Sequence, residues 1–440
     1  MSPPRRLSRE LPSLVGQEVR VAGHLQDYRA LGGVSFALVR DRAGLFQLTL
    51  KKGQSPEALF ELFQNLPRES VVRAQGTVVA NPRAKVGAEV SPTAVEVLSR
   101  SAVPLPLGVS DKVGADLDTR LNHRVLDLRK PENQVIAELR ATMLWALRES
   151  FGELGFTEVE TPKILRQGAE GGATMFKVDY YGSPAYLAQS PQLYKQMLMA
   201  TDLERVFEIA PAFRAEPSDT NRHMTEFTSI DAEMAYIDGP EELWDTVEEL
   251  IAGTFRRTRE RLLSRGSPFA EKIPEVERPF PRVTHREGSE LLGRKPGTPA
   301  IDAEIGSEEE RALGDLVHKK YGNDFYLLTE FPTSLKAGTF YAMRQDAHPE
   351  LTNYFDLEFR GLELMSGGQR EHRVDRLEAN MQAAGVDAKN FAGYLEAFRY
   401  GMPPHGGFAL GLDRIVQRLA GLSNIREARL FPRDRFRLEP

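Results

Sequence analysis

The fold is decided by one stretch near the middle of the chain, Val206-Phe207-Glu208-Ile209-Ala210-Pro211-Ala212-Phe213-Arg214-Ala215-Glu216. A polar loop separates it from a second apolar segment that begins Glu226-Phe227-Thr228. Short apolar runs bounded by polar loops favour β-strands, so we expect strands at 204–213 and 227–236. Two further strand candidates, 355–365 and 408–411, lead us to expect an antiparallel sheet.

Helices are expected in the sequence before the first of these strands and between the second and third. A long amphipathic helix should begin at Pro131, because apolar residues then recur at helical spacing, at Val135, Leu139, Met143, Leu144 and Leu147. The stretch 240–320 is charged and helix-rich, and we interpret it as an insertion. Helices packed around an antiparallel sheet define the α+β class.

The front of the chain has a different pattern. We expect a helix at 55–63 and short strands at 19–24, 34–39, 45–50, 71–79 and 90–98. Five strands with a helix between the third and fourth is the order of an OB-fold, a small β-barrel that binds single-stranded nucleic acid. We therefore expect an OB-fold domain at 1–105, a hinge at 106–130 and a second domain at 131–440.

Composition narrows the class of protein. The chain has 440 residues, of which 41% are hydrophobic and 27% charged, as in soluble globular proteins. It has no cysteine, which excludes disulfides, thiolate metal sites and a thiol nucleophile. We see no apolar run long enough to span a membrane and no apolar segment behind the basic residues Arg5 and Arg6 that would make a secretory signal. We expect a cytoplasmic enzyme with no membrane partner.

Charge is distributed unevenly. Residues 1–130 hold 19 Lys and Arg against 13 Asp and Glu, whereas residues 131–440 hold 38 against 50. A basic front on an acidic body is typical of a protein that grips an anionic partner with its front domain. An ordinary solvated surface explains the same counts, and charge alone leaves both interpretations open.

Three separated segments resemble the signature motifs of class II aminoacyl-tRNA synthetases. They are Gly155-Phe156-Thr157-Glu158-Val159-Glu160-Thr161-Pro162, the stretch 206–228 quoted above, and Gly406-Gly407-Phe408-Ala409-Leu410-Gly411-Leu412-Asp413-Arg414. Two more, Gln189-Ser190-Pro191-Gln192-Leu193-Tyr194-Lys195-Gln196 and Gly361-Leu362-Glu363-Leu364-Met365-Ser366-Gly367-Gly368-Gln369-Arg370, resemble the aspartyl-tRNA synthetases. Each motif alone is weak, but their order behind an OB-fold is specific. The length resembles the compact archaeal type of this subclass IIb family.

The resemblance implies an ATP site. Arg214 would bind the α-phosphate and Arg414 the γ-phosphate, and both would be catalytic, since a guanidinium pairs with phosphate through a planar fork. Phe227 would stack on adenine and Glu216 would meet its amino group. The remaining ATP-binding residues would be Arg222, His223, Met224, Glu363, Gly411, Leu412 and Asp413. Glu363 and Ser366, with Asp356 on a neighbouring turn of the same hairpin as a weaker candidate, would hold Mg²⁺, which prefers oxygen ligands.

The resemblance also implies an aspartate site. Lys195 and Arg370 would flank the side-chain carboxylate, so that neutral asparagine would leave two cations poorly paired. The other members would be Glu170, Ser190, Gln192, Arg214, Asp231 and Ser366. Each residue also has an ordinary structural explanation: a surface salt bridge for a lone Arg, core packing for Phe227, and a plain loop for His223.

The implied reaction first joins L-aspartate to AMP, from ATP, as aspartyl-adenylate with release of pyrophosphate. The aspartyl group then passes to the 3′ end of tRNA(Asp). The substrate carboxylate is already ionised at neutral pH, so the first step needs positioning and charge neutralisation rather than a general base. In the OB-fold, Phe36 would stack on an anticodon base, while Arg29 and Gln47 would contact the tRNA. Core packing is the alternative for Phe36.

One departure concerns the choice of tRNA. Relatives restricted to tRNA(Asp) carry a Trp at the position of His24 in this chain, and they carry a Lys near the position of Pro82. His24 and Pro82 therefore resemble the relaxed forms that also charge tRNA(Asn). Lys85 could itself supply the missing Lys, which leaves a strictly discriminating enzyme as the alternative. The resemblance further implies a homodimer with Pro162 at its interface.

Two alternative functions make different predictions for the sequence. A tRNA-independent ligase that activates aspartate would lack the OB-fold expected at 1–105. A non-catalytic RNA-binding paralogue would be expected to have lost Arg214, Glu363 or Arg414, and all three are present.

Overall fold

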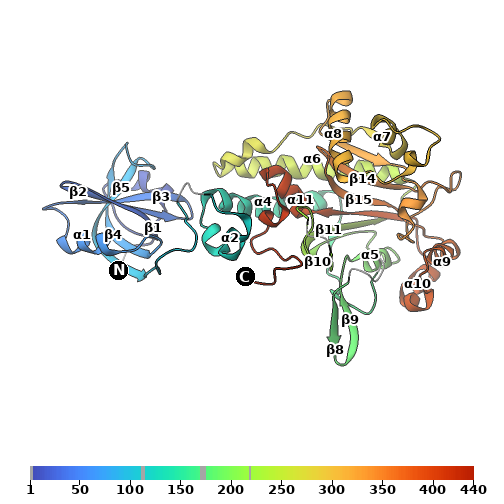
Figure 1. Ribbon diagram of the computed structural model, residues 1–440, viewed down its shortest axis with the longest axis horizontal. Helices are drawn as coiled ribbons and strands as arrows, with labels where there is room; N and C mark the ends of the chain where they lie inside the picture. The colour runs from blue at the N-terminus through green and yellow to red at the C-terminus, as the bar shows by residue number, and fades with distance from the viewer. Residues whose placement is uncertain (1–2, 111–113, 169–174, 218–219) are drawn as a thin grey trace. The chain divides into compact units, whose positions relative to one another are not determined.

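The computed structural model describes residues 3–110, 114–168, 175–217 and 220–440 (Figure 1). The chain divides into two compact units, Met1–Leu126 and Asp127–Pro440, and the division falls within the stretch 106–130. Outside the barrel and the main sheet, the helices and small strands are α2 (Leu117–Asn122), α3 (Arg124–Asp127), α4 (Pro131–Glu153), α5 (Gln192–Leu198), α6 (Pro240–Ser264), α7 (His285–Leu291), α8 (Ser307–Tyr321), α9 (Val374–Ala383), α10 (Ala392–Arg399), α11 (Leu412–Ala420), β7 (Ile164–Leu165), β8 (Lys177–Tyr180) and β9 (Ser183–Leu187).

The first unit contains a closed five-stranded barrel with strand order β1-β2-β3-β5-β4. Its elements are β1 (Glu18–Leu31), β2 (Val34–Asp41), β3 (Gly44–Lys51), α1 (Glu57–Asn65), β4 (Val71–Ala80) and β5 (Ala88–Ser99). Gly32 adopts a φ of +62° in the turn between β1 and β2, a conformation that glycine reaches without steric cost. The predicted OB-fold is confirmed, including the helix between the third and fourth strands.

The second unit is built on an eight-stranded sheet with the order β12-β13-β14-β15-β16-β11-β10-β6. The strands are β6 (Thr157–Glu158), β10 (Arg205–Phe213), β11 (Glu226–Ala235), β12 (Arg282–Thr284), β13 (Phe325–Thr329), β14 (Tyr354–Phe359), β15 (Glu363–Gln369) and β16 (His405–Gly411). The six central strands pair antiparallel, as predicted. The short edge strands β6 and β12 pair parallel to their neighbours, so the sheet is mixed.

The single strand predicted at 355–365 is wrong, because the structure has a hairpin there. Arg360 and Gly361 both have positive φ, at 50° and 66°, and reverse the chain between β14 and β15. This turn meets α8 closely: a Cβ on Gly314 would lie 2.4 Å from the backbone nitrogen of Gly361. Asp356 therefore lies within a strand, directly opposite Ser366, and not on a turn.

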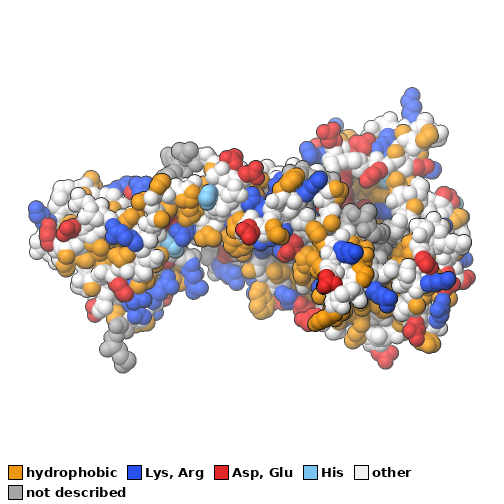
Figure 2. Space-filling view, turned by 60° about the horizontal axis from the view of Figure 1, so that its bottom comes forward, with side chains coloured by type: hydrophobic (Ala, Val, Ile, Leu, Met, Phe, Trp, Pro, Cys, Tyr) orange, Lys and Arg blue, Asp and Glu red, His pale blue; other side chains and the backbone are white. Residues whose placement is uncertain are grey.

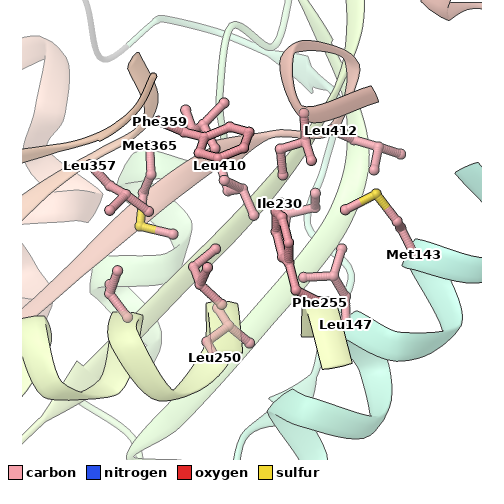
Figure 3. Packing of buried hydrophobic residues seen from close by; sticks show 14 of the residues in the cluster. Met143, Leu147, Ile230, Leu250, Phe255, Leu357, Phe359, Met365, Leu410 and Leu412 are labelled. Carbon is pink, nitrogen blue, oxygen red and sulfur yellow. The ribbon is translucent and has the colours of Figure 1, made fainter. Parts of the chain in front are cut away.

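The two faces of the sheet differ in polarity, because successive side chains of a strand point to opposite faces. One face packs against α4 and α6 to form the main core, shown in Figure 3 with Ile230, Leu357, Met365 and Leu410 pointing towards Leu147, Leu250 and Phe255. The intervening residues belong to the other face: Ser229, Asp231 and Glu233 in β11, Asp356 and Glu358 in β14, and Ser366 in β15. Helix α6, which lies in the stretch interpreted as an insertion, thus supplies part of the central core.

Candidate active site

A cavity of about 660 Å³ opens on the polar face of the sheet. Sixteen of the predicted site residues line it: Ser190, Gln192, Lys195, Arg214, Glu216, Arg222, His223, Met224, Phe227, Asp231, Glu363, Ser366, Arg370, Gly411, Asp413 and Arg414. Leu412 does not line the cavity, since its side chain is fully buried in the main core. Glu170 lies outside the described residues. Sequence segments separated by more than 200 residues thus converge on one cavity.

Lys195 lies at one end of the cavity and is almost fully buried. Its ammonium lies 3.2 Å from Asp231 Oδ1 and 3.4 Å from Glu233 Oε2, and it donates to the Phe408 carbonyl oxygen at 3.0 Å. Helix α5 packs on β11, so the turn of α5 that carries Lys195 faces the sheet. A buried charge with this many partners is fixed in position rather than mobile.

Arg370 follows β15 and points into the same end of the cavity. Its Nε donates to Glu233 Oε1 at 2.9 Å and its Nη2 donates to Glu233 Oε2 at 3.3 Å. Its third nitrogen, Nη1, is buried and has no hydrogen-bond partner among the described residues. Burial opposes ionisation of Glu233, but Arg370 and Lys195 outweigh it and hold the Glu233 pKa below its ordinary value.

Glu233 was missed by the sequence analysis, although a signal was present. It lies two residues after Asp231 on a strand, so both carboxylates must lie on one face. It adds a second carboxylate to the predicted Asp231, so that two carboxylates and two cations make this end of the site neutral overall.

A buried polar network supports this end from behind. Gln196 accepts hydrogen bonds from Gln192 Nε2 at 3.0 Å and from the Tyr394 hydroxyl at 3.1 Å. His405 Nδ1 donates to the Pro403 carbonyl at 2.9 Å, so its Nε2 accepts from Gln196 Nε2 at 3.1 Å. Burial lowers the pKa of His405 to about 4, which keeps the imidazole neutral and fixes this pattern.

Arg214 and Phe227 face each other at the other end of the cavity. The Arg214 guanidinium lies 5.2 Å from the centre of the Phe227 ring, within the range of a cation–π contact. Strand pairing of β10 with β11 fixes both residues, since Phe227 is the partner of Ala212, which lies two residues before Arg214. This gives a flat aromatic surface beside a cation, which suits a base attached to a phosphate.

The loop between β10 and β11 is tied to two other elements. Arg222 Nη1 donates to Glu310 Oε2 on α8 at 2.7 Å. Asn221 accepts through its carbonyl from the Ile425 amide at 2.9 Å. Burial, together with Arg414, Arg214 and Arg222, lowers the pKa of His223 against the opposing effect of Glu216, so His223 is neutral at pH 7.

Asp413 and Arg414 lie in the first turn of helix α11 but have different surroundings. Arg414 Nη1 lies 3.1 Å from Glu363 Oε1 and donates to the Glu363 carbonyl at 2.9 Å. Asp413 is buried and accepts from the Thr228 amide at 2.8 Å and from Arg140 of α4. Arg414 is therefore the member of this pair that can reach a ligand, while Asp413 anchors the helix.

Three carboxylates lie together near Ser366, on β14 and β15. Glu363 faces Arg414, while Asp356 and Glu358 are buried. Burial raises the pKa of Asp356 to about 6, with Lys336 opposing the shift and Glu363 adding to it. Burial and the neighbouring Glu310, Glu363 and Asp356 raise the pKa of Glu358 well above its ordinary value.

This carboxylate group is suited to a divalent cation on chemical grounds. Asp356 Oδ1 and Glu358 Oε2 are buried and have no hydrogen-bond partner among the described residues. No cluster of three or more His, Asp or Glu side chains in the described part of the chain is preformed for a metal ion by itself. Oxygen ligands from one or two carboxylates, completed by substrate phosphates, are the usual environment of Mg²⁺.

The barrel has a separate cavity of about 520 Å³, lined by Phe36, Gln47, Asn81, Pro82 and Arg83. Three of these, Phe36, Gln47 and Pro82, were predicted site residues. Arg29 is the strand partner of Phe36 and is exposed, with its Nε 2.8 Å from Asp27 Oδ2. Of the residues assigned to tRNA discrimination, Lys85 is exposed and does not line the cavity, and His24 lies on β1 as a partner of Arg40 and Val71.

Glu89, which the sequence analysis missed, organises the barrel cavity. Its Oε2 accepts from Gln47 Nε2 at 2.9 Å, from Thr49 Oγ1 at 2.8 Å and from Asn81 Nδ2 at 2.6 Å.

Lys and Arg side chains occur alongside Asp and Glu on the drawn face of each unit (Figure 2). Within the described residues, no helix has the length and apolar character needed to cross a membrane.

Comparison with known proteins places these sites in a family. The family described as class II tRNA synthetases (D, K and N) matches residues 116–435, and the OB-fold nucleic acid binding domain matches residues 19–98. The aspartate–tRNA(Asp/Asn) ligase of Methanopyrus kandleri is 47% identical over 98% of this chain and 97% of its own length. The aspartate–tRNA(Asp) ligase of Pyrococcus horikoshii is 45% identical over 97% of both chains.

Solved structures agree with the sequence comparison. The asparaginyl-tRNA synthetase of Pyrococcus horikoshii complexed with asparaginyl-adenylate superposes with a TM-score of 0.90 at 32% identity, covering 99% of this chain and all of that one. The aspartyl-tRNA synthetase of Entamoeba histolytica superposes with a TM-score of 0.87 at 31% identity, covering 99% of this chain and 93% of that one. The chain belongs to the class II tRNA synthetases of the D, K and N group.

Proposed function

We propose that this enzyme is an aspartate–tRNA ligase. It would join L-aspartate to the AMP part of ATP as aspartyl-adenylate, with release of pyrophosphate, and then transfer the aspartyl group to the 3′ end of tRNA(Asp), with release of AMP. The observation that carries the proposal is the single cavity with Lys195 and Arg370 at one end and Arg214, Phe227 and Arg414 at the other. Such a cavity can hold an acidic amino acid and a nucleotide in one line. Two aspartate–tRNA ligases at 45% and 47% identity support the same conclusion.

The residues at the nucleotide end would act by positioning and charge. Phe227 would carry the adenine, Glu216 would accept from its amino group, and Arg222, His223 and Met224 would border the nucleotide. Arg214 would bind the α-phosphate beside the attacking carboxylate, where negative charge grows in the transition state. Arg414 would bind the γ-phosphate, which requires it to leave Glu363. Mg²⁺, held by Glu363 and Ser366 with Asp356 beside them, would supply further charge neutralisation at the phosphates.

Selectivity for aspartate follows from charge balance. The described side chains Lys195, Arg370, Asp231 and Glu233 sum to zero. Bound aspartate adds its ammonium near Asp231 and its side-chain carboxylate near Arg370 Nη1, and the sum remains zero. Asparagine would add the ammonium alone and turn amide hydrogens towards a cation, which is costly in a buried site. Ser190, Gln192 and Ser366 would complete the polar wall.

We further propose relaxed choice of tRNA, homodimer formation and a cytoplasmic location. Phe36 would stack on an anticodon base, with Gln47 and Arg29 as neighbouring contacts. His24 and Pro82 are the residues that favour charging of tRNA(Asn) as well.

The proposed dimer interface would include Pro162, which follows the edge strand β6. Trp145 and Ile164, which are 59% and 52% exposed, are further candidate interface residues. Sedimentation at micromolar concentration tests the dimer, and a monomer would refute it.

The central experiment is aspartate-dependent exchange of pyrophosphate into ATP. Wild-type protein should catalyse exchange with aspartate and not with asparagine, and Arg214→Gln should abolish it. Arg256→Gln, in an exposed pair on α6, is the matched control and should behave as wild type. Absence of exchange by pure wild-type protein would remove the proposal in favour of a non-catalytic RNA-binding role.

A second experiment separates the tRNA hypotheses. Purified tRNA(Asp) and tRNA(Asn) are charged side by side with labelled aspartate. Charging of both supports relaxed choice, and refusal of tRNA(Asn) leaves a strictly discriminating enzyme. Exchange without charging of either tRNA would point to the tRNA-independent ligase.

A further inference from the structure

Lys336 is a cation in the nucleotide half of the cavity, and it belongs to none of the sequence motifs. It ends a short 3-10 turn, Thr333–Lys336, and its side chain lines the same cavity as Arg214 and Glu363. Its ammonium lies 4.1 Å from the centre of the Phe331 ring and 4.4 Å from that of Tyr354. Two aromatic faces hold a cation by their negative quadrupoles, so the position of the ammonium is fixed.

The anion that faces Lys336 is Asp356. The Lys336 Nζ lies 3.6 Å from Asp356 Oδ2, and only 18% and 12% of the two side chains are exposed. Asp356 is the strand partner of Ser366, the residue that we assign to Mg²⁺ together with Glu363. The ammonium therefore lies where a metal would meet Asp356.

The same arrangement is repeated at the neighbouring carboxylate. Arg414 pairs with Glu363 at 3.1 Å as Lys336 pairs with Asp356. Arg414 lies on α11, and its side chain can turn to a phosphate. Lys336 is confined by Phe331 and Tyr354, so a divalent cation at Asp356 has to compete with it for one carboxylate.

We propose that Lys336 holds the place of a divalent cation beside Asp356 in the nucleotide-free enzyme and competes with the metal for that site. The proposal rests on the metal position proposed above. It makes Lys336 a positioning residue, whose charge balances that of the buried Asp356 until nucleotide and metal arrive together. The physical basis is repulsion between a unit charge and a divalent charge that share one ligand.

The test is Mn²⁺ binding without nucleotide at pH 8, measured by the electron paramagnetic resonance signal of free Mn²⁺. Lys336→Met keeps the length and the apolar stem against Phe331 and Tyr354 but removes the charge. Lys336→Arg keeps the charge, and Lys319→Met on the exposed surface of α8 is the matched control. Thermal melts establish that each variant is folded.

Lys336→Met should bind Mn²⁺ about tenfold or more tightly than wild type, because a unit charge beside the ligand is gone. Lys336→Arg and Lys319→Met should stay within about twofold of wild type. Unchanged or weaker binding by Lys336→Met, an equal gain in Lys336→Arg, or no binding by any folded variant would overturn the proposal. The measurement involves no turnover, so pyrophosphate exchange by wild type tests the proposed function separately.

Discussion

Arg370 and Glu233 form a buried two-point ion pair, with Nε and Nη2 of the guanidinium 2.9 Å and 3.3 Å from the two carboxylate oxygens. The side chains are 2% and 0% exposed. Two of the guanidinium nitrogens are used in holding the side chain, and Nη1 is left for a ligand. The pair therefore orients Arg370 and cancels its charge at the same time.

Breaking this pair should destabilise the second unit strongly. Arg370→Leu leaves the Glu233 carboxylate buried and without its main counter-ion, and we expect a loss of about 3–5 kcal/mol in the free energy of unfolding. The double change Arg370→Leu with Glu233→Leu should recover most of that loss. Urea unfolding followed by tryptophan fluorescence reports on this unit, since both tryptophans, Trp145 and Trp244, belong to it.

The matched control for this cycle is Arg256→Leu, which breaks the exposed pair with Glu260 and should cost less than about 1 kcal/mol. A loss in the double variant equal to that in Arg370→Leu would show that packing, and not the unpaired charge, determines the effect.

Lys195→Met should weaken the use of aspartate far more than the binding of ATP. Lys195 lies 3.2 Å from Asp231 and next to the aspartate end of the cavity, so its loss leaves a carboxylate pair without its second cation. We expect kcat/KM for aspartate in pyrophosphate exchange to fall about 10²–10³-fold. The dissociation constant for ATP, measured by calorimetry, should change less than about threefold.

Lys389→Met, at an exposed position, is the control for removal of a lysine and should match wild type. Equal losses for aspartate and ATP in Lys195→Met would mean that the whole site had been disturbed, and they would contradict a specific role.

The residues of the site that belong to motifs could be predicted from the sequence, but the charged residues that pack around them were missed. Arg214, Glu363 and Arg414 belong to local motifs, so their convergence could be expected. Glu233 and Lys336 belong to no motif. Only the folded structure brings Glu233 on β11 against Arg370 and Lys195, and the turn Thr333–Lys336 to the cavity. Glu233 could have been found from its spacing to Asp231, whereas nothing in the sequence marks Lys336.

The errors in the fold have a similar physical origin. The hairpin at Arg360 and Gly361 lies between two segments in which apolar and charged residues alternate, so the alternation was interpreted as one strand, although Gly361 is a turn signal. The parallel edge strands β6 and β12 have two and three residues, too few for periodicity to appear. By contrast, α4 and the barrel strands were predicted because their periodic burial extends over many residues.

Stability should fall between pH 6.5 and 4, in part because of His405. Its pKa is about 4 in the folded protein, against 6.5 ordinarily, so the unfolded chain binds a proton in this interval that the folded chain does not. The neutral imidazole therefore contributes stability above pH 6.5, and this contribution, up to about 3 kcal/mol, is lost as the pH falls towards 4.

His405→Gln should be less stable at pH 7 but should lose less stability on acidification to pH 5 than wild type does. Urea unfolding of both proteins at the two pH values gives the comparison. His285, buried with a pKa of about 4, titrates in the same direction in both proteins and cancels in the difference. Equal pH dependence in the two proteins would exclude His405 as a source.

The barrel cavity should affect tRNA and leave amino-acid activation alone. Gln47 gives both amide hydrogens to groups inside the barrel, Glu89 and Thr49, so its carbonyl oxygen is the atom presented to a base beside the Phe36 ring. Phe36→Ala removes a stacking surface worth about 1–3 kcal/mol, which predicts a rise of about 5- to 150-fold in KM for tRNA. Pyrophosphate exchange, which needs no tRNA, should be unchanged within about twofold, and Leu31→Ala, at a position 66% exposed on the same barrel, should leave both activities unaltered. An effect of Phe36→Ala on exchange as large as that on charging would mean that Phe36 supports the fold of the barrel and does not contact tRNA.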